Sequence, residues 1–213
     1  MKIISLSSSI SGPACAIGLC IRKHFYNNNY QTNMFDYLEI SLLSIIQILF
    51  LNEGDINYLH MNNEIFNNTD GNNSVIFKNF DKIISHHDLC LNYSDKDYTK
   101  FIDKYKRRYH RLIEYINTED KIVFIRYGIE KTIEIQNFMD KITEINPKLK
   151  VFFINVNYDD AEKNINYKIK NVFYINFYDY IDVNITYDKN LFYKTMQYDW
   201  KIINDLINHM SNI

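Results

Sequence analysis

Glycine, proline and cysteine are all scarce in this sequence of 213 residues, which contains 5 Gly, 2 Pro and 3 Cys. So little glycine and proline excludes a collagen-like chain and a long low-complexity linker. The cysteines are odd in number and form no Cys-x-x-Cys pair, so we expect neither a disulfide framework nor a zinc site. No other pattern indicates a metal or a cofactor, and the sequence predicts neither.

No sign of charge dominates either, because 24 Lys and Arg residues are balanced by 26 Asp and Glu residues. A net charge of −2 gives no general attraction to nucleic acid or to anionic membranes. The longest apolar run, residues 40–51, is too short to span a bilayer, and the first residues do not resemble a signal peptide. We therefore expect a cytoplasmic protein that does not bind membranes. Abundant Asn, Ile, Lys and Tyr is typical of AT-rich genomes, including those of large DNA viruses, for which the compartment is the host cytoplasm.

Hydrophobic residues make up 46% of the chain and charged residues 23%, a globular composition that fits a single domain over residues 1–213. Apolar segments of strand length alternate with amphipathic segments of helical period. Strands are predicted at 2–6, 74–77, 82–85, 121–127, 150–156 and 171–177, and helices at 15–24, 38–51, 95–117, 132–145 and 191–210. Residues 52–74 are predicted to form a surface excursion. This order predicts an α/β fold with three layers, an open and mostly parallel sheet with helices on both faces.

In such a sheet the carboxyl ends of the parallel strands share one edge, where binding loops gather. Three predicted loops follow strands there: a serine-rich loop after residues 2–6, the segment 126–128, and residues 155–160. The serine-rich loop leads into a helix whose first turn contains Cys15. Unpaired amides and the helix dipole favour an anion at that point, either a bound phosphate or a cysteine thiolate.

Cys15 has two interpretations. A thiol at a helix N-terminus has a lowered pKa and can act as a nucleophile. Alternatively, Cys15 is a small buried residue that fills a tight contact between a strand and a helix. Cys20 and Cys90 are predicted to be core residues.

Several motifs follow one another along the first two-thirds of the chain. They are residues 12–23 (GPACAIGLCIRK), residues 33–37 (NMFDY), the His87-Asp88 pair, residues 104–111 (KYKRRYHR) and the apolar strand 122–126. In this combination they resemble a family of putative papain-like cysteine peptidases. Two positions depart from the family pattern, because Met34 stands where proline is usual and Tyr37 where tryptophan is usual.

The resemblance implies a thiol-dependent hydrolase or transferase. Cys15 would attack a carbonyl group, and His87 would act as the general base. Asp36 or Asp88 would orient the imidazole. Amides of residues 12–16 would stabilise the oxyanion.

Other interpretations of the same residues remain open. Residues 86–88 also fit a solvated turn, and Asp36 also fits a cap of the 38–51 helix. The predicted 95–117 helix carries a basic cluster, which would either bind phosphate or RNA or form an ordinary solvated face. The members of this cluster are Lys104, Lys106, Arg107, Arg108 and Arg111.

The alternative function is a noncatalytic binding module for a phosphate-bearing ligand, such as a nucleotide or the 5′ end or cap of an RNA. Hydroxyls, amides and guanidinium groups would hold the phosphate, and an aromatic ring would stack on the base. The residues predicted for these contacts are Ser8, Ser9, Ser11, Gly12, Arg107, Arg108, Arg126 and Tyr127. A third option is an interaction subunit whose surface aromatics bind a protein partner.

Overall fold

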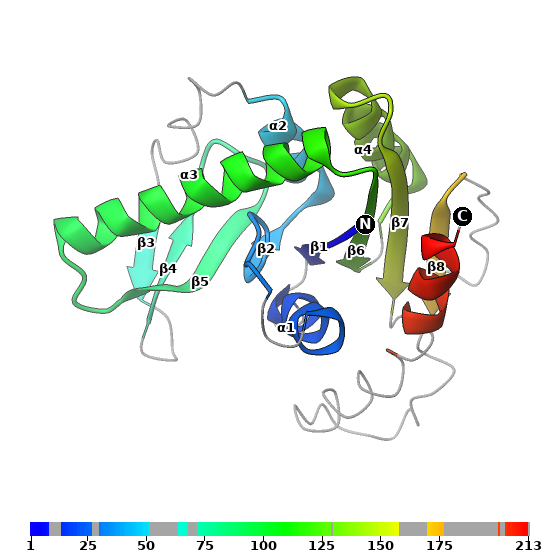
Figure 1. Cartoon of the computed structure of the whole chain (residues 1–213). Coiled ribbons are helices and arrows are strands. Elements are labelled where there is room, and N and C mark those ends of the chain that lie inside the picture. The colour runs from blue at the N-terminus through cyan, green and yellow to red at the C-terminus, as the bar shows by residue number, and fades with distance from the viewer. Residues whose placement is uncertain are drawn as a thin grey trace.

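The computed structural model describes residues 1–8, 14–26, 30–51, 64–67, 72–128, 130–157, 170–176, 200 and 203–212. Their strands form an eight-stranded sheet in the order β3-β4-β5-β2-β1-β6-β7-β8 (Figure 1). The strands are β1 (Lys2–Ser8), β2 (Leu38–Ile40), β3 (Glu64–Asn67), β4 (Asn72–Ile76), β5 (Ile83–Cys90), β6 (Lys121–Tyr127), β7 (Lys150–Asn157) and β8 (Val172–Asn176). The helices are α1 (Ala14–Phe25), α2 (Leu42–Leu49), α3 (Asp95–Thr118), α4 (Thr132–Ile145) and a closing helix over 203–211.

The sheet has a parallel part and an antiparallel part. Strands β2, β1, β6, β7 and β8 pair in parallel, whereas β3, β4 and β5 are joined to one another and to β2 by antiparallel pairs. The carboxyl ends of β1, β6 and β7 share one edge, because Ser8 pairs with Tyr127 and Tyr127 pairs with Val156. The predicted α/β fold with an open, mostly parallel sheet is therefore confirmed.

Side chains alternate between the two faces of the sheet, as the strand period requires. On β6, Ile122 and Phe124 pack into a core with α2, α3 and α4, while Val123 and Ile125 pack into a second core with α1 and the closing helix. Figure 1 shows α1 and α3 on opposite sides of the sheet. Full burial of a side chain of this size contributes about 1.5–3 kcal/mol, so these two cores hold both helix layers against the strands.

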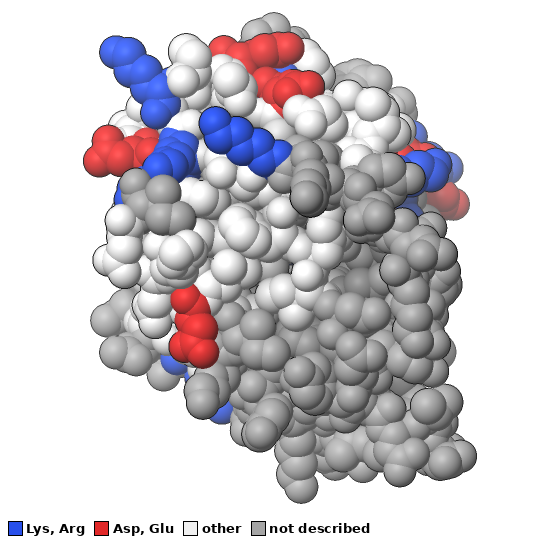
Figure 2. All heavy atoms as spheres, turned by 90° about the vertical axis from the view of Figure 1, so that its right-hand side faces the viewer, with Lys and Arg blue, Asp and Glu red and all other residues white. Residues whose placement is uncertain are grey.

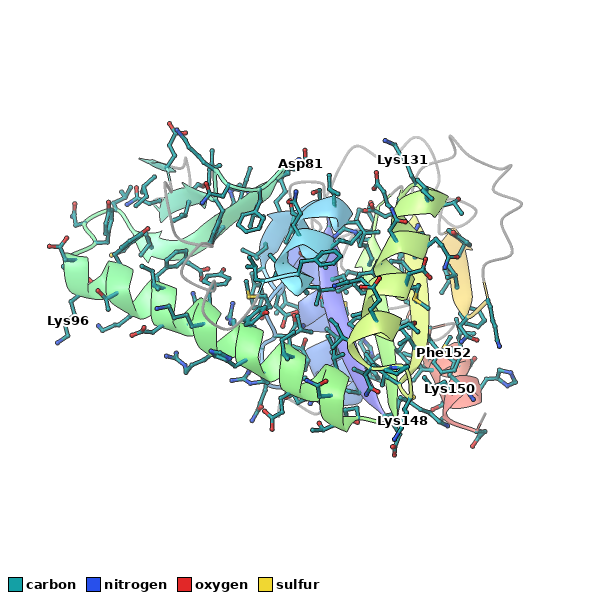
Figure 3. All side chains as sticks on the ribbon, turned by 90° about the horizontal axis from the view of Figure 1, so that it is seen from above. Asp81, Lys96, Lys131, Lys148, Lys150 and Phe152 are labelled. Carbon is teal, nitrogen blue, oxygen red and sulfur yellow. The ribbon has the colours of Figure 1, made fainter. Side chains whose placement is uncertain are left out.

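Helix α3 is amphipathic and crosses one face of the sheet. It begins at a capping box, in which the side chains of Ser94 and Asp97 accept hydrogen bonds from each other's backbone N–H groups. The hydrogen bonds from Ser94 lower the pKa of Asp97 to about 2. The buried stripe of the helix consists of Phe101, Tyr105, Tyr109, Leu112 and Ile116. In Figure 3, α3 runs from an outer end marked by Lys96 toward the start of β7, beside Lys148 and Lys150.

The structure differs from the prediction over residues 38–51. This segment forms strand β2 followed by helix α2, rather than one buried helix. Ser41 separates the two elements as the N-cap of α2, and its Oγ accepts a hydrogen bond from the N–H of Ser44 at 3.0 Å. An apolar run without clear period does not distinguish a buried strand from a buried helix. Pairing with β5 and β1 decided the conformation of Leu38–Ile40.

Other segments also differ from the prediction or extend it. The predicted surface excursion at 52–74 contains strand β3 and the first residues of β4, while 52–63 lies outside the described residues. Strand β5 is longer than predicted and continues through residues 86–88, so these residues are not a solvated turn. The closing helix is confirmed over 203–211, and 191–199 lies outside the described residues. None of the described helices has the length and apolar character that crossing a bilayer requires.

Charged side chains of both signs lie close together on the face shown in Figure 2, which is the side of the molecule at the right of Figure 1. This mixture agrees with the net charge of −2. Among the described residues of this face, neither sign of charge dominates.

Candidate functional site

A buried carboxylate, that of Asp36, lies in the turn that leads into β2. The N–H of Leu38 closes this turn by donating to the carbonyl oxygen of Phe35 at 3.1 Å, and Tyr37 adopts a φ of 68°. The carboxylate of Asp36 accepts hydrogen bonds from the N–H of Asn33 at 2.8 Å, from Asn33 Nδ2 at 3.0 Å and from the Tyr30 hydroxyl at 3.2 Å. Asp36 therefore does not cap a helix; it is anchored in the protein interior between α1 and β2.

Helix α1 packs directly against this carboxylate at Gly18. A Cβ atom at position 18 would lie 2.9 Å from Asp36 Oδ1, which is closer than real Cβ contacts. Glycine is needed here for the close approach of the helix backbone to a polar group that is fixed by other bonds. Cys15 precedes Gly18 by one turn in α1, about 4.5 Å along the helix axis. The side chain of Cys15 lies outside what the structure describes.

Burial is the main influence on the charge of Asp36. The side chain is fully buried, and this desolvation raises its pKa to about 7. Hydrogen bonds from Asn33, Tyr30 and Ser5 and the charge of Arg108 act in the opposite direction without cancelling the effect. Ser5 is itself fixed on β1, because its Oγ accepts a hydrogen bond from the N–H of Ser7 at 3.0 Å. Near neutral pH, Asp36 can therefore both hold and release a proton.

Strand β5 contains a bulge at the predicted histidine. Val75 of β4 pairs with Ser85, and Asn73 pairs with Leu89. Between these two pairs β4 has one residue, whereas β5 has residues 86–88. Bulges of this kind redirect side chains and are frequent beside active sites. The backbone of His87 lies in the bulge; its side chain lies outside what the structure describes.

The bulge and the Asp36 turn lie at the same end of β2. Leu38, the first residue of β2, pairs with Ser85, the last residue of β5 before the bulge. Asp36 precedes the first of these by two residues, and His87 follows the second by two. The antiparallel pairing of β2 and β5 therefore brings the backbones of both predicted site residues to one place in the fold.

Asp88 belongs to a cluster between β5 and α3. Its carboxylate accepts hydrogen bonds from Ser85 Oγ at 2.6 Å, from Lys104 Nζ and from the Tyr105 hydroxyl. Burial opposes ionisation of Asp88, but the charge of Lys104 and these hydrogen bonds outweigh it and lower its pKa. Asp88 is therefore an ionised anchor for α3.

The two adjacent arginines of α3 have different environments. Arg107 is exposed, whereas Arg108 is half-buried. The guanidinium of Arg108 lies over the Tyr105 ring, 5.4 Å from its centroid. Its Nη1 is buried, and no described residue forms a hydrogen bond with it. The approximately 100° between successive helix positions separates the two side chains.

Arg126 is a scaffold residue rather than an exposed ligand contact. Its side chain is fully buried, and its Nε donates to Glu130 Oε1 at 2.6 Å. Its Nη1 donates to the carbonyl oxygen of Leu6 at 2.6 Å, and its Nη2 to that of Ile40 at 2.8 Å. All three guanidinium nitrogens are thus bonded to the protein, and they connect β6 to β1 and β2.

The remaining residues predicted for phosphate binding give less information. Ser8 is buried and lies on β1 between its neighbours β2 and β6. Tyr127 is half-buried at the end of β6. Ser9, Ser11 and Gly12 lie outside the described residues.

The two other cysteines differ from each other. Cys20 is in the core, as predicted, and desolvation raises its pKa to about 12. Cys90 was predicted to be a core residue, and this was wrong: it is exposed at the last position of β5, where the strand ends at the surface. Among the residues that the structure describes, no three His, Cys, Asp or Glu side chains gather closely enough to hold a metal ion.

One protein-family model matches most of the chain. The model of the family described as "Putative papain-like cysteine peptidase (DUF1796)" matches residues 2–161. The chain belongs to this family. The matched range includes α1, the Asp36 turn, the β5 bulge and α3, so the elements that meet around Asp36 all lie within the family's part of the chain. A search of curated proteins found no significant match, and neither did a search of solved structures.

Several residues around Asp36 were not predicted from the sequence of this family member. They are Ser5, Gly18, Tyr30 and Asn33. Gly18 carried a signal of its own, since glycine is costly inside a predicted helix and is usually kept there for a packing or functional reason. Asn33 lies in the quoted 33–37 motif, but no role was predicted for it. The other three are ordinary polar residues, and only the folded chain shows that their donors converge on one carboxylate.

Proposed function

We propose that this chain is a cysteine-dependent hydrolase in which Cys15 is the nucleophile, His87 the general base and Asp36 the group that orients the imidazole. One observation carries the proposal. The Asp36 carboxylate is sealed in the interior against Gly18, one turn from Cys15, and it lies at the same end of β2 as the β5 bulge that contains His87. Membership of a cysteine peptidase family supports the same assignment.

In the proposed reaction, the Cys15 thiol gives its proton to His87 and the thiolate sulfur bonds to the carbonyl carbon of the substrate. The carbonyl electron pair moves to oxygen, where free amides of the first turn of α1 stabilise it. When the carbonyl re-forms, the bond to the leaving group breaks and the leaving group takes the proton from His87. Water then attacks the thioester, gives a proton back through His87, and releases the acid and the free thiol.

Asp36 is better suited than Asp88 to orient the base. Asp88 already accepts bonds from Ser85, Lys104 and Tyr105, so its charge is compensated within the α3 cluster. Asp36 has a raised pKa, and an imidazolium that forms beside it would favour its ionised state. The carboxylate would thereby stabilise the charge that His87 acquires during the reaction.

The test is the rate of Cys15 alkylation by iodoacetamide as a function of pH. The Cys90→Ser background removes the exposed thiol, and Cys20 does not compete because burial raises its pKa to about 12. We expect a midpoint well below the ordinary thiol pKa of about 8.5, and loss of that shift in His87→Ala. Cys15→Ser identifies the labelled position.

His86→Ala is the matched control for the histidine. The two residues are adjacent, but His86 bonds Glu39 and Ser74, each at 3.1 Å, so its removal should leave the Cys15 midpoint in place. An ordinary midpoint near about 8.5 that does not respond to His87→Ala would contradict the proposal. If phosphate or a nucleotide then raised the melting temperature, the result would support the phosphate-binding module instead.

A further inference from the structure

Helix α3 lies against the segment that ends in the Asp36 turn. Arg111 Nη1 donates to the carbonyl oxygen of Thr32 at 2.8 Å, and the Tyr115 hydroxyl donates to Gln31 Oε1 at 3.2 Å. These positions are four apart on one face of α3, and Arg108 lies on the same face one turn earlier. The charge of Arg108 also acts on Asp36, whose pKa it lowers. Arg108 therefore faces the segment that carries Asp36.

Arg108 has a hydrogen-bonding capacity that the described part of the chain does not use. Its Nη1 is buried and has no partner among the residues that the structure describes, although the guanidinium is held in position over the Tyr105 ring. A buried charged donor without an acceptor is costly, and native proteins seldom keep one without a purpose. The buried Arg126 is a contrast within the same chain, because each of its guanidinium nitrogens has an acceptor in the protein.

The charges around Arg108 favour a ligand with one negative charge. Lys104 forms an ion pair with Asp88, so these two charges compensate each other. Arg108 is left with Asp36, which is buried and has a raised pKa near neutrality. The ionised Asp36 carboxylate would repel a dianionic phosphate more strongly than a ligand with one negative charge. A single carboxylate also matches the planar fork of a guanidinium.

We propose that Arg108 binds a carboxylate of the substrate, so that the enzyme acts on acyl compounds that carry a negative charge close to the reacting carbonyl. This inference rests on the proposed function, because it places the carboxylate beside the Cys15 thiol. In this proposal Arg108 determines substrate specificity. Arg107, on the exposed side of α3, does not.

Two alkylating reagents of nearly equal shape test this inference. Iodoacetate carries a carboxylate and iodoacetamide is neutral, so the ratio of their rates at Cys15 reports binding of the carboxylate and cancels changes in the reactivity of the thiol. In the Cys90→Ser background we expect Arg108→Gln to lower this ratio roughly tenfold, which is the lower end of the effect of a hydrogen bond to a charged group. Arg107→Gln removes a neighbouring charge of the same sign and should leave the ratio unchanged.

Arg108→Lys provides a second variant in case Arg108→Gln does not fold. It keeps the charge but loses the two-pronged fork, so the ratio should fall to an intermediate value. Inorganic phosphate and acetate, used as protecting ions, distinguish the two kinds of anion. Acetate should slow the labelling of Cys15 by iodoacetamide, and stronger protection by phosphate would overturn the assignment to a carboxylate.

The outcomes separate this inference from the function on which it rests. The inference would be overturned if the rate ratio were the same with and without the Arg108→Gln substitution. If iodoacetamide labelling still depended on His87, the proposed function would stand. Equal losses in Arg107→Gln and Arg108→Gln would indicate a general charge effect and also overturn it. If Cys15 reacts with neither reagent in a way that depends on His87, both proposals fail.

Discussion

Replacing Asp36 by asparagine tests the main electrostatic feature of the site, a carboxylate held in the interior. Burial raises the pKa of Asp36 from 3.8 to about 7. At 1.36 kcal/mol for each pKa unit, ionisation of this carboxyl costs about 4 kcal/mol more in the folded protein than in the unfolded chain. The amide of the Asp36→Asn variant has the same shape and does not ionise.

The sign of the pH effect follows from the two pKa values of Asp36. Well below the unfolded pKa of 3.8 the carboxyl is protonated in both states. As the pH rises, the unfolded chain loses this proton first, because its carboxyl titrates near 3.8 and the folded one near about 7. The favourable contribution of the protonated group is therefore complete below the unfolded pKa and is lost as the pH rises through the folded pKa. Asp36→Asn should lack this loss of stability.

Urea unfolding at a series of pH values measures the effect. We expect the free energy of unfolding of Asp36→Asn, relative to wild type, to increase by about 4 kcal/mol from about pH 4 to about pH 8. The hydrogen bonds changed by the amide add an offset that does not depend on pH. Asp103→Asn is the matched control, because Asp103 is exposed on α3 and its charge stays in water in both states. A difference between Asp36→Asn and wild type that is flat across this range would refute the argument from burial.

Two further predictions concern packing around the site and in the scaffold. Gly18→Ala adds about 1 kcal/mol of helix propensity, but its Cβ would lie 2.9 Å from Asp36 Oδ1, so we expect a net destabilisation of roughly 1–2 kcal/mol by urea unfolding. In an Asp36→Ala background the same substitution should stabilise the protein, and stabilisation in the wild-type background would show that the contact is not tight. Arg126→Met leaves Glu130 buried without its partner, and we expect a loss of about 3–5 kcal/mol. Adding Glu130→Leu should recover most of this loss; a single variant as stable as wild type would show that the ion pair is dispensable.

The sequence predicted those elements whose signal is local. The structure has β6 at Lys121–Tyr127 and α4 at Thr132–Ile145, with the predicted bounds, and α3 differs from its prediction by one residue at its end. In each case the apolar period of a short segment matches the face that it buries. The resemblance to the family was confirmed over residues 2–161, whereas the roles of Cys15 and His87 are predictions.

The conformation of Leu38–Ile40, by contrast, depended on contacts with distant strands. Its apolar sequence fits a helix as well as a strand, and only pairing with β5 and β1 selected the strand. The sequence did not reveal the environment of Arg126 either. An arginine at the end of an apolar strand is predicted to face a ligand, but here β6 lies beside β1, and the carbonyl oxygens of Leu6 and Ile40 are close enough to accept its donors.

Asp36 combines a feature that the sequence predicted with features that only the structure shows. Its place in the motif of residues 33–37 made Asp36 a candidate to orient the imidazole, but the motif did not reveal its partners. Ser5, Gly18 and Asn33 reach it from β1, from α1 and from the preceding loop. The hydrophobic period depends on residues that are neighbours in the sequence, so it can be read from the sequence alone. Desolvation and hydrogen bonding are properties of the space around a side chain, and that space exists only after the sheet and both helix layers have assembled.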